Sequence, residues 1–339
     1  GCALANINSD MFIVWLAFSA KSDTFSMSNI DELKHMWNDF ENNNPYGLTK
    51  LSILYWARES SPIKYKEIRD NSIDAQIEAM IKLSITSKNK NYGCGDTDFA
   101  KILNMMYKDN FACAGIKSDK WFRYASHRWV EDECGTTLRQ KISKELADIY
   151  RAKEETITRK MQSGGDENKT RSESEEKQYS SWGNQCIKLL DIVTHLSSTT
   201  HKDHILKEAR ELFYDANIRF MDLLDSNPKL MCFKNGVIDF QEKTFRSGRA
   251  EDYLEKSTNI NYVPLDRNRD AKIIAEINDF MEKLFPIERL RNYMWEHFAS
   301  ILIGGNASQK MHMYIGHGEN GKSVLTDLMS KCLGDYYSV

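Results

Sequence analysis

The sequence lacks several features that would assign it to a simple class. Its seven cysteines are scattered, without a C-x-x-C pair, which disfavours a zinc finger or a disulfide framework. The apolar run from Met11 to Phe18 is too short to cross a bilayer, and no basic segment precedes it as in a signal peptide. Reduced thiols without a targeting segment are typical of a cytoplasmic or nuclear protein, and we expect no membrane partner.

The chain also lacks a strong charge of either sign. Its formal net charge is −3 over 339 residues, so no global basic field indicates nucleic acid. A local basic patch or an assembled ring can still supply such contacts. The composition, with 41% hydrophobic and 28% charged residues, is that of an ordinary globular protein, and the length predicts about two or three modules.

What the sequence does contain is a phosphate-binding loop near its end. Gly316, Gly321, Lys322 and Ser323 satisfy the pattern G-x-x-x-x-G-K-[ST]. The apolar run 311–315 before the loop predicts a buried strand, and apolar residues after it recur at helical spacing. Strand, glycine loop and helix form the context that this motif needs.

The chemistry of this loop predicts binding of ATP with Mg²⁺, rather than a structural turn with a solvated lysine. Backbone N–H groups would surround the β-phosphate, helped by the positive end of the helix dipole. Lys322 would act catalytically by reaching the β- and γ-phosphates, and the Ser323 hydroxyl would ligate Mg²⁺. The predicted nucleotide-binding residues are Gly316, His317, Gly318, Glu319, Asn320, Gly321, Lys322 and Ser323.

The remaining parts of an ATPase site do not follow the loop. Sixteen residues come after Ser323, too few to hold the carboxylates that orient Mg²⁺ and water. The chain also begins with Gly1 rather than methionine. We therefore expect it to be an internal fragment of a longer protein.

Upstream of the loop, apolar periodicity predicts mostly helices. Residues 28–60 and 72–85 predict a small helical module, Asp96 or Thr97 is expected to cap a further helix, and 270–304 is predicted helical. The apolar positions of the first two regions are Ile30, Leu33, Trp37, Phe40, Leu51, Leu54, Tyr55, Trp56, Ile73, Ile77, Met80 and Ile81.

Two β-hairpins interrupt this helical pattern. One is predicted over 120–130, where aromatic residues alternate around a turn, and one over 231–240, around Asn235-Gly236. Asp239 in the second hairpin is interpreted as a turn-stabilising side chain. Phe245-Arg246 and residues 261–264 are expected to complete this β-rich piece.

Residues 153–181 form the clearest low-complexity segment. Charged residues, serine and Gly164-Gly165 dominate it, and little is available to bury. We predict an exposed helix end followed by a mobile linker rather than a basic DNA arm, because acidic residues are mixed throughout.

With these segments in view, the chain resembles the superfamily 3 helicase-primases of nucleocytoplasmic large DNA viruses, of the poxvirus NTPase-primase type, with relatives in phages and plasmids. The most specific similarity spans Tyr293 to Leu333. Phe233 to Asp239 resembles the "NGV-D" hairpin of the family's helicase-associated domain, and Trp121 to Trp129 its upstream aromatic hairpin. Leu48 to Glu59 resembles the helical module after viral primase domains.

The resemblance implies a domain plan. Residues 1–24 would be the tail of a primase domain, 25–88 a helical primase C-terminal module, 89–265 a helicase-associated α+β domain, and 266–339 the incomplete start of the ATPase domain. The implied fold is mixed α/β, mainly helical with β-hairpins in the N-terminal two-thirds. It would end in the first strand, P-loop and helix of an α/β AAA+-like helicase domain.

The resemblance also implies function and partners. The family's proteins are ATP-driven DNA helicases that form homo-hexamers, so single-stranded or forked DNA would be the partner, and the replicative polymerase is a further candidate. The site of action would be where viral DNA replicates, in the host cytoplasm or nucleus. The helicase residues that carry over by position are those of the loop alone: Gly316, Gly318, Asn320, Gly321, Lys322 and Ser323.

Two groups of side chains outside the loop were weighed as binding sites. Cations interleaved with aromatics suit single-stranded DNA, but large aromatics are more often buried, and we favour a core role. The candidate nucleic-acid residues are Lys120, Trp121, Arg123, Tyr124 and Arg128. His195, His201 and His204 invite a metal interpretation, which we disfavour because no cysteine or fixed carboxylate accompanies them.

Two other classes of function stay open. One is a P-loop enzyme of another class, such as a small-molecule kinase, although such enzymes usually carry the loop near the N-terminus of a compact domain. The other, for the fragment by itself, is a non-catalytic module for binding or ring assembly.

Overall fold

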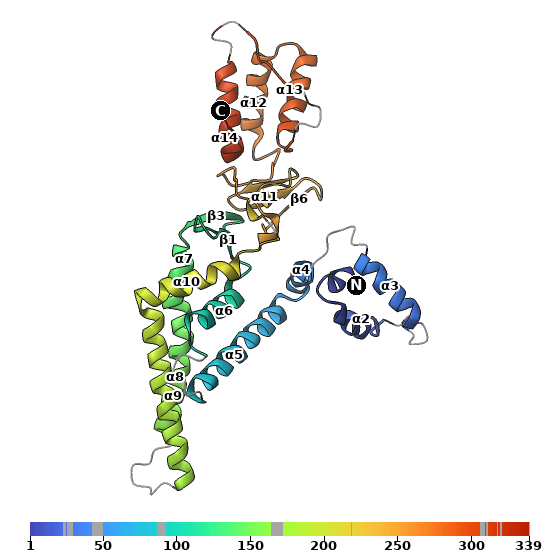
Figure 1. Ribbon diagram of the computed structural model, residues 1–339. Helices are drawn as coiled ribbons and strands as arrows, with labels where there is room; N and C mark the ends of the chain where they lie inside the picture. The colour runs from blue at the N-terminus through green and yellow to red at the C-terminus, as the bar shows by residue number, and fades with distance from the viewer. Residues whose placement is uncertain are drawn as a thin grey trace. The chain divides into compact units, whose positions relative to one another are not determined.

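The computed structural model describes residues 1–22, 25, 30–42, 50–86, 93–163, 172–217, 219–305, 309, 311–316, 318 and 321–338. The chain divides into two compact units, residues 1–79 and 80–339 (Figure 1). Helices predominate and two small antiparallel sheets occur in the second unit, so the prediction of a mainly helical α/β chain with hairpins is confirmed. Among the described residues, no helix has the length and apolarity to cross a membrane.

Aromatic side chains form the centre of the first unit. The rings of Trp15 and Trp37 lie 5.8 Å apart, and Phe40 stands edge-on to Trp15 at 5.5 Å. The helices of this unit are α1 (Cys2–Ala5), α2 (Phe12–Ser19), α3 (Ile30–Asn42), α4 (Lys50–Ser60) and the first part of α5 (Pro62–Thr86), with a 3₁₀ turn at Ser9–Met11. The helices predicted over 28–60 and 72–85 are thus present.

Helix α5 begins ten residues before its predicted start, because Pro62 occupies its first position, where the missing N–H costs nothing. Ile73, Ile77, Met80 and Ile81 are all buried, as their spacing predicts.

The second unit begins with α6 (Asp96–Tyr107) and a sheet of β1 (Phe111–Gly115), β2 (Lys120–Ala125) and β3 (Arg128–Glu133). The predicted cap of α6 is wrong by one residue. Gly95 is the N-cap, and its N–H donates to the Asp98 carboxylate at 3.2 Å. An acceptor at the third helical position lets the helix start one residue earlier than a cap at Asp96 or Thr97 allows.

The hairpin predicted over 120–130 is confirmed, with β2 and β3 paired up to Ala125 and Arg128. The aromatic side chains of Trp121 and Phe122 are completely buried, and Trp129 is 4% exposed. The core role that we favoured for these aromatics is therefore correct.

A long helical hairpin follows the sheet (Figure 1). Its helices are α7 (Thr136–Lys141), a π-helical turn at Ile142–Leu146, α8 (Ala147–Ser163) and α9 (Glu173–Ser197), followed by α10 (Thr199–Phe213) and α11 (Phe220–Leu223). Leu138, Ile142, Leu146, Leu189 and Leu196 are fully buried along it.

The exposed helix end predicted at the start of 153–181 is present, since α8 continues to Ser163, whereas the linker prediction is wrong for 173–181, which belong to α9. Charge is compatible with helix here because it is paired one turn apart, as in Lys177 with Glu173 at 2.6 Å. Ser172 and Glu175 add a capping box. Gly164 and Gly165 lie outside the described residues.

A second sheet joins β4 (Leu230–Phe233), β5 (Gly236–Asp239) and β6 (Thr244–Arg246), followed by a 3₁₀ turn at Ala250–Asp252. The predicted hairpin is present, and Asp239 stabilises its turn as expected by accepting from the Gln241 N–H at 3.0 Å. Residues 261–264 form no strand. Instead, the Asn235 side chain exchanges two hydrogen bonds with the Tyr262 backbone, of 2.8 and 2.9 Å.

Three helices at the C-terminal end pack around one apolar cluster. They are α12 (Ala271–Leu284), α13 (Glu288–Ile301) and α14 (Lys322–Leu333), and a 3₁₀ turn at Gly334–Tyr336 follows. The helical stretch predicted over 270–304 is two helices with Pro286 between them. Met281 of α12, Met294 and Phe298 of α13, and Leu325 of α14 meet in the cluster.

Candidate functional site

The phosphate-binding motif lies at the start of α14, as the sequence predicts. Gly321 is the N-cap, with φ of +78°, and the Leu325 N–H donates to its carbonyl at 3.0 Å. This left-handed conformation favours glycine. A glycine cap also has no side chain to occupy the first N–H groups of the helix, which leaves them for an anion.

Lys322 lies across the loop. Its Nζ donates to the Gly316 carbonyl oxygen at 3.0 Å, so the cation of the motif reaches the opposite end of the loop. Ser323 is exposed beside it. A Cβ added at Gly318 would meet nothing within 4 Å, which leaves open space over that part of the loop. His317, Glu319 and Asn320 of the predicted site lie outside the described residues.

Helix α14, which carries these residues, is fixed by packing against neighbouring helices. Leu325, one turn after Gly321, is 4% exposed in the cluster of α12, α13 and α14. A Cβ at Gly321 would lie 3.0 Å from Leu284 Cδ1, so α12 also approaches the loop closely. Packing on two neighbouring helices therefore positions the N-terminus of α14.

The segment 311–315 does not form the buried strand that the sequence predicts. It has no strand assignment, and Met311 and Ile315 are 81% and 89% exposed. A strand requires neighbours for its backbone hydrogen bonds, and no described strand lies beside this segment. Instead, Tyr314 bonds His297 of α13 at 2.7 Å.

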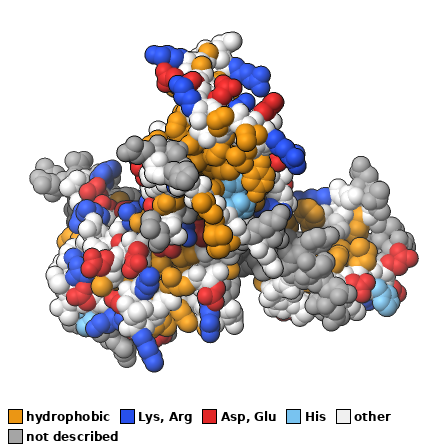
Figure 2. Space-filling model, turned by 90° about the horizontal axis from the view of Figure 1, so that it is seen from above, with side chains coloured by type: hydrophobic (Ala, Val, Ile, Leu, Met, Phe, Trp, Pro, Cys, Tyr) orange, Lys and Arg blue, Asp and Glu red, His pale blue; other side chains and the backbone are white. Residues whose placement is uncertain are grey.

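Apolar side chains gather on this end of the molecule. Figure 2, which looks onto the C-terminal helices from above, shows a hydrophobic patch with histidine beside it. The exposed apolar residues of α13 and the following segment include Leu290, Tyr293, Trp295, Ile301, Leu302, Ile303, Met311, Met313 and Ile315. Burial, with the neighbouring His312, lowers the pKa of His297 at this surface.

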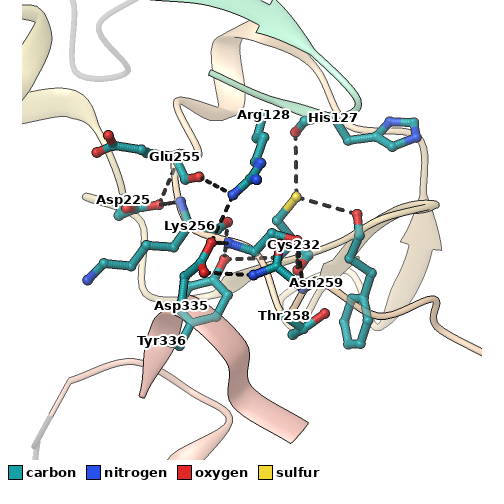
Figure 3. A network of polar contacts seen from close by, with 12 residues as sticks. His127, Arg128, Asp225, Cys232, Glu255, Lys256, Thr258, Asn259, Asp335 and Tyr336 are labelled. Carbon is teal, nitrogen blue, oxygen red and sulfur yellow. Dashed lines mark hydrogen bonds and ion pairs between the residues drawn. The ribbon is translucent and has the colours of Figure 1, made fainter. Parts of the chain in front are cut away.

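The other end of α14 is bound to the sheet region. Asp335 accepts hydrogen bonds from Arg128 Nη1 at 2.8 Å, Asn259 Nδ2 at 2.7 Å and the Ser257 N–H at 3.1 Å (Figure 3). Gly334 has φ of +56°, and a Cβ there would overlap the Thr258 backbone. The P-loop helix is therefore held at both ends.

Tyr336 extends this network into the second sheet. Its hydroxyl accepts from the Cys232 N–H and donates to the Lys256 carbonyl, both at 3.0 Å. Burial raises the pKa of Asp335, but the bonds from Ser257, Asn259 and Arg128 outweigh that effect, so the pKa lies below its ordinary value.

The predicted nucleic-acid residues do not form one exposed surface. Trp121 is fully buried, which leaves no exposed face of its indole for a base to stack on. Arg128 is bound to Asp335, and Lys120 pairs with Glu131 at 3.3 Å. Burial raises the pKa of Tyr124 strongly.

A carboxylate does accompany the three histidines, contrary to our expectation. Asp96 Oδ1 lies 2.7 Å from His195 Nε2, and Asp96 also lies 3.4 Å from ring nitrogens of His201 and His204. Sequence reasoning missed Asp96 because 99 residues separate it from His195.

The chain is similar to known viral proteins. The family model described as "D5 N terminal like" matches residues 100–286, more than half of the chain. The chain is 29% identical over 337 residues to a "Putative helicase" of Acanthamoeba polyphaga mimivirus, covering 99% of this chain and 32% of that protein.

Two further relatives are more distant. A "Putative helicase" of Frog virus 3 is 26% identical, with 95% of this chain and 39% of that protein covered. A "Putative primase" of African swine fever virus is 23% identical, with 99% and 34% covered. The chain thus spans about a third of the length of the curated relatives it matches.

Proposed function

Because this chain belongs to the D5 N terminal like family of viral primase-helicases, we propose that it is the ATP-binding segment of a motor that unwinds DNA during viral replication. The names of the relatives support a DNA-processing enzyme. The observation that carries the ATP-binding part is the position of Lys322 at the N-terminus of α14, with its Nζ over the loop that begins at Gly316.

The geometry suits a nucleoside triphosphate in three ways. The N-terminus of α14, where Gly321 provides no side-chain cap, favours phosphate through its N–H groups and its partial positive charge. Lys322 Nζ, which donates to the Gly316 carbonyl at 3.0 Å, lies where it could instead donate to phosphate oxygens. The exposed Ser323 hydroxyl is available to Mg²⁺.

Completion of the ATPase site requires more strands beside 311–315. The exposed apolar side chains of this segment support their presence in the assembled protein, since contiguous apolar surface usually marks a contact site. A later strand would end in acidic residues near Ser323, and a neighbouring subunit would supply an arginine. Homo-hexamer formation, DNA binding and action in the compartment where viral DNA replicates are parts of the same proposal.

The two alternative functions predict different behaviour. A P-loop kinase of another class would bind a second, phosphate-accepting substrate beside the loop. A non-catalytic module for ring assembly or for binding the replicative polymerase would function with the loop empty. The family match over residues 100–286 favours the motor over the kinase.

Binding of a fluorescent ATP analogue to this chain tests the proposal. We expect weak binding that ATP and pyrophosphate reverse and adenosine does not, because the loop contacts phosphates. Lys322→Ala should abolish it, and the matched control Lys331→Ala, on the exposed last turn of α14, should not. Equal binding by Lys322→Ala would contradict a phosphate site. We expect no sustained hydrolysis by the chain alone.

A further inference from the structure

A second cluster of chemically capable side chains lies far from the loop, where three helix ends meet. Asp96 is the first residue of α6, His195 lies in the last turn of α9, and His201 and His204 lie three residues apart near the start of α10. Residues with that separation share one face of a helix. Packing of α6 against α10 brings the carboxylate to this face.

Two distances within the cluster match the spacing of ligand atoms around a small cation. His201 Nδ1 lies 3.4 Å from Asp96 Oδ1, and His204 Nδ1 lies 3.4 Å from Asp96 Oδ2. Tetrahedral coordination with metal–ligand bonds of about 2.0–2.1 Å places neighbouring ligand atoms roughly 3.4 Å apart. Ligand atoms of Asp96, His201 and His204 all lie within 4.8 Å of one another.

One buried ring nitrogen in the cluster lacks a hydrogen bond among the described residues. His201 Nδ1 is buried from solvent and forms no hydrogen bond with any described residue. A buried polar atom of this kind calls for an explanation, and a bound ion is one of the usual ones. Because His204 is half exposed, an ion has a path from solvent and room for a water ligand.

His195 has a different position from the other two histidines. Its Nε2 lies at hydrogen-bond distance, 2.7 Å, from Asp96 Oδ1, and its ring stacks on His201 with centroids 3.6 Å apart. Ligating carboxylates are typically fixed by such an outer hydrogen bond. His195 therefore orients Asp96 and His201 rather than completing the ligand set.

The frame around the cluster is fixed independently of any ion. Thr97 Oγ1 donates to Glu208 at 2.9 Å, which ties the start of α6 to α10. Arg139 Nε donates to Asp203 at 2.6 Å, which ties α10 to α7. The ligands are thus preorganised by contacts that removal of the ion leaves in place.

We propose that Asp96, His201 and His204 bind one divalent transition-metal ion, with His195 as the residue that orients the carboxylate. Two imidazole nitrogens and one carboxylate favour Zn²⁺ over Mg²⁺ or Ca²⁺, which prefer oxygen ligands. The ion links the starts of α6 and α10, and so stabilises the helical part of the second unit.

Zn²⁺ titration of the chelator-treated chain, purified without an affinity tag, tests this assignment. A competing chromophoric chelator reports the Kd. We expect one site per chain, a Tm higher by about 5 °C with Zn²⁺ at about one hundred times its Kd, and no equivalent effect of Mg²⁺.

Variants separate ligands from the orienting residue. His204→Ala and Asp96→Asn should weaken Zn²⁺ binding by more than about 100-fold, whereas His195→Ala should weaken it by about 10- to 100-fold. His35→Ala, on the exposed face of α3, is the matched control and should bind as the unchanged chain does. Asp96→Asn keeps the side-chain shape, so it remains informative if His204→Ala fails to fold.

Two results would overturn the assignment. One is wild-type Zn²⁺ affinity in both Asp96→Asn and His204→Ala. The other is a Tm that depends on pH through the histidines and does not change when Zn²⁺ is added. That result would mean that the cluster binds protons only.

Discussion

The Arg128 guanidinium donates to the Asp335 carboxylate at 2.8 Å, across 207 residues of sequence. Arg128 begins β3 of the aromatic hairpin, and Asp335 follows the P-loop helix α14. This pair therefore connects the hairpin that carries the candidate nucleic-acid residues with the segment predicted to bind ATP. Its partners Ser257 and Asn259 add the second sheet to the same network (Figure 3).

A double-mutant cycle measures this connection. Because both side chains are partly exposed, we expect Arg128→Ala or Asp335→Ala to lower the free energy of unfolding by about 1–2 kcal/mol each. The double variant should lose less than the sum, with a coupling of roughly 0.5–1 kcal/mol in urea denaturation. Additive losses would show that the two residues act separately.

Acid should weaken this network and, separately, the contacts of Asp239 in the second sheet. Burial raises the pKa of Asp239, but backbone N–H groups and Arg246 outweigh it and lower the pKa. The pKa of Asp335 is lowered in the same way by its own partners. A carboxylate with a lowered folded pKa contributes stability above its unfolded pKa of about 3.9, and this contribution is lost as pH falls through the folded pKa.

For these two groups, we expect a stability plateau above about pH 5 and a decline below about pH 4. Urea denaturation at stepped pH measures it. Asp335→Asn should show a shallower decline than the unchanged chain, and an identical slope would contradict the role assigned to Asp335.

Substitutions of Trp121 and Arg123, which lie on the same strand, distinguish a role in the core from a role in DNA contact. Trp121→Ala should cost about 3–5 kcal/mol of stability, because it empties a fully buried volume. Arg123→Ala, at a half-buried position, should change stability by less than about 1 kcal/mol. A shift in binding of single-stranded DNA by folded Arg123→Ala would support a nucleic-acid contact at this strand, and unchanged binding would remove Arg123 from the candidates.

Two loop glycines have different tolerance to substitution. Gly321→Ala should destabilise the chain by about 1–3 kcal/mol, because φ is +78° and Leu284 lies close to the new methyl group. Gly318→Ala places its methyl group in open space and is the matched control for stability. Thermal unfolding compares them, and equal Tm values would mean that the conformation of Gly321 is not required.

Local patterns predicted local structure well. The aromatic hairpin, the Asn-Gly hairpin, the turn at Asp239 and the P-loop helix all followed from short-range periodicity and turn chemistry. Strand β1 was missed because Phe111–Gly115 is short and shows no clear polar alternation. The segment 173–181 was predicted as linker because composition does not reveal charges paired one turn apart.

Contacts between residues far apart in the chain could not be predicted from the sequence. Nothing near the histidines indicates that Asp96 joins them, since tertiary packing of α6 on α10 creates that proximity. Arg128 and Asp335 are the same kind of case. The segment 311–315 has the composition of a buried strand, but a strand forms only where neighbouring strands supply hydrogen bonds.

ATP-dependent unwinding of forked DNA by a full-length protein that carries this chain tests the central claim most directly. We expect Lys322→Ala to reduce unwinding at least a hundredfold, because stabilisation of transferring phosphate charge is worth a few kcal/mol. Lys331→Ala, on the same helix, should unwind at the unchanged rate. Unwinding by Lys322→Ala at the unchanged rate would contradict the assignment of this loop as the motor's ATP site.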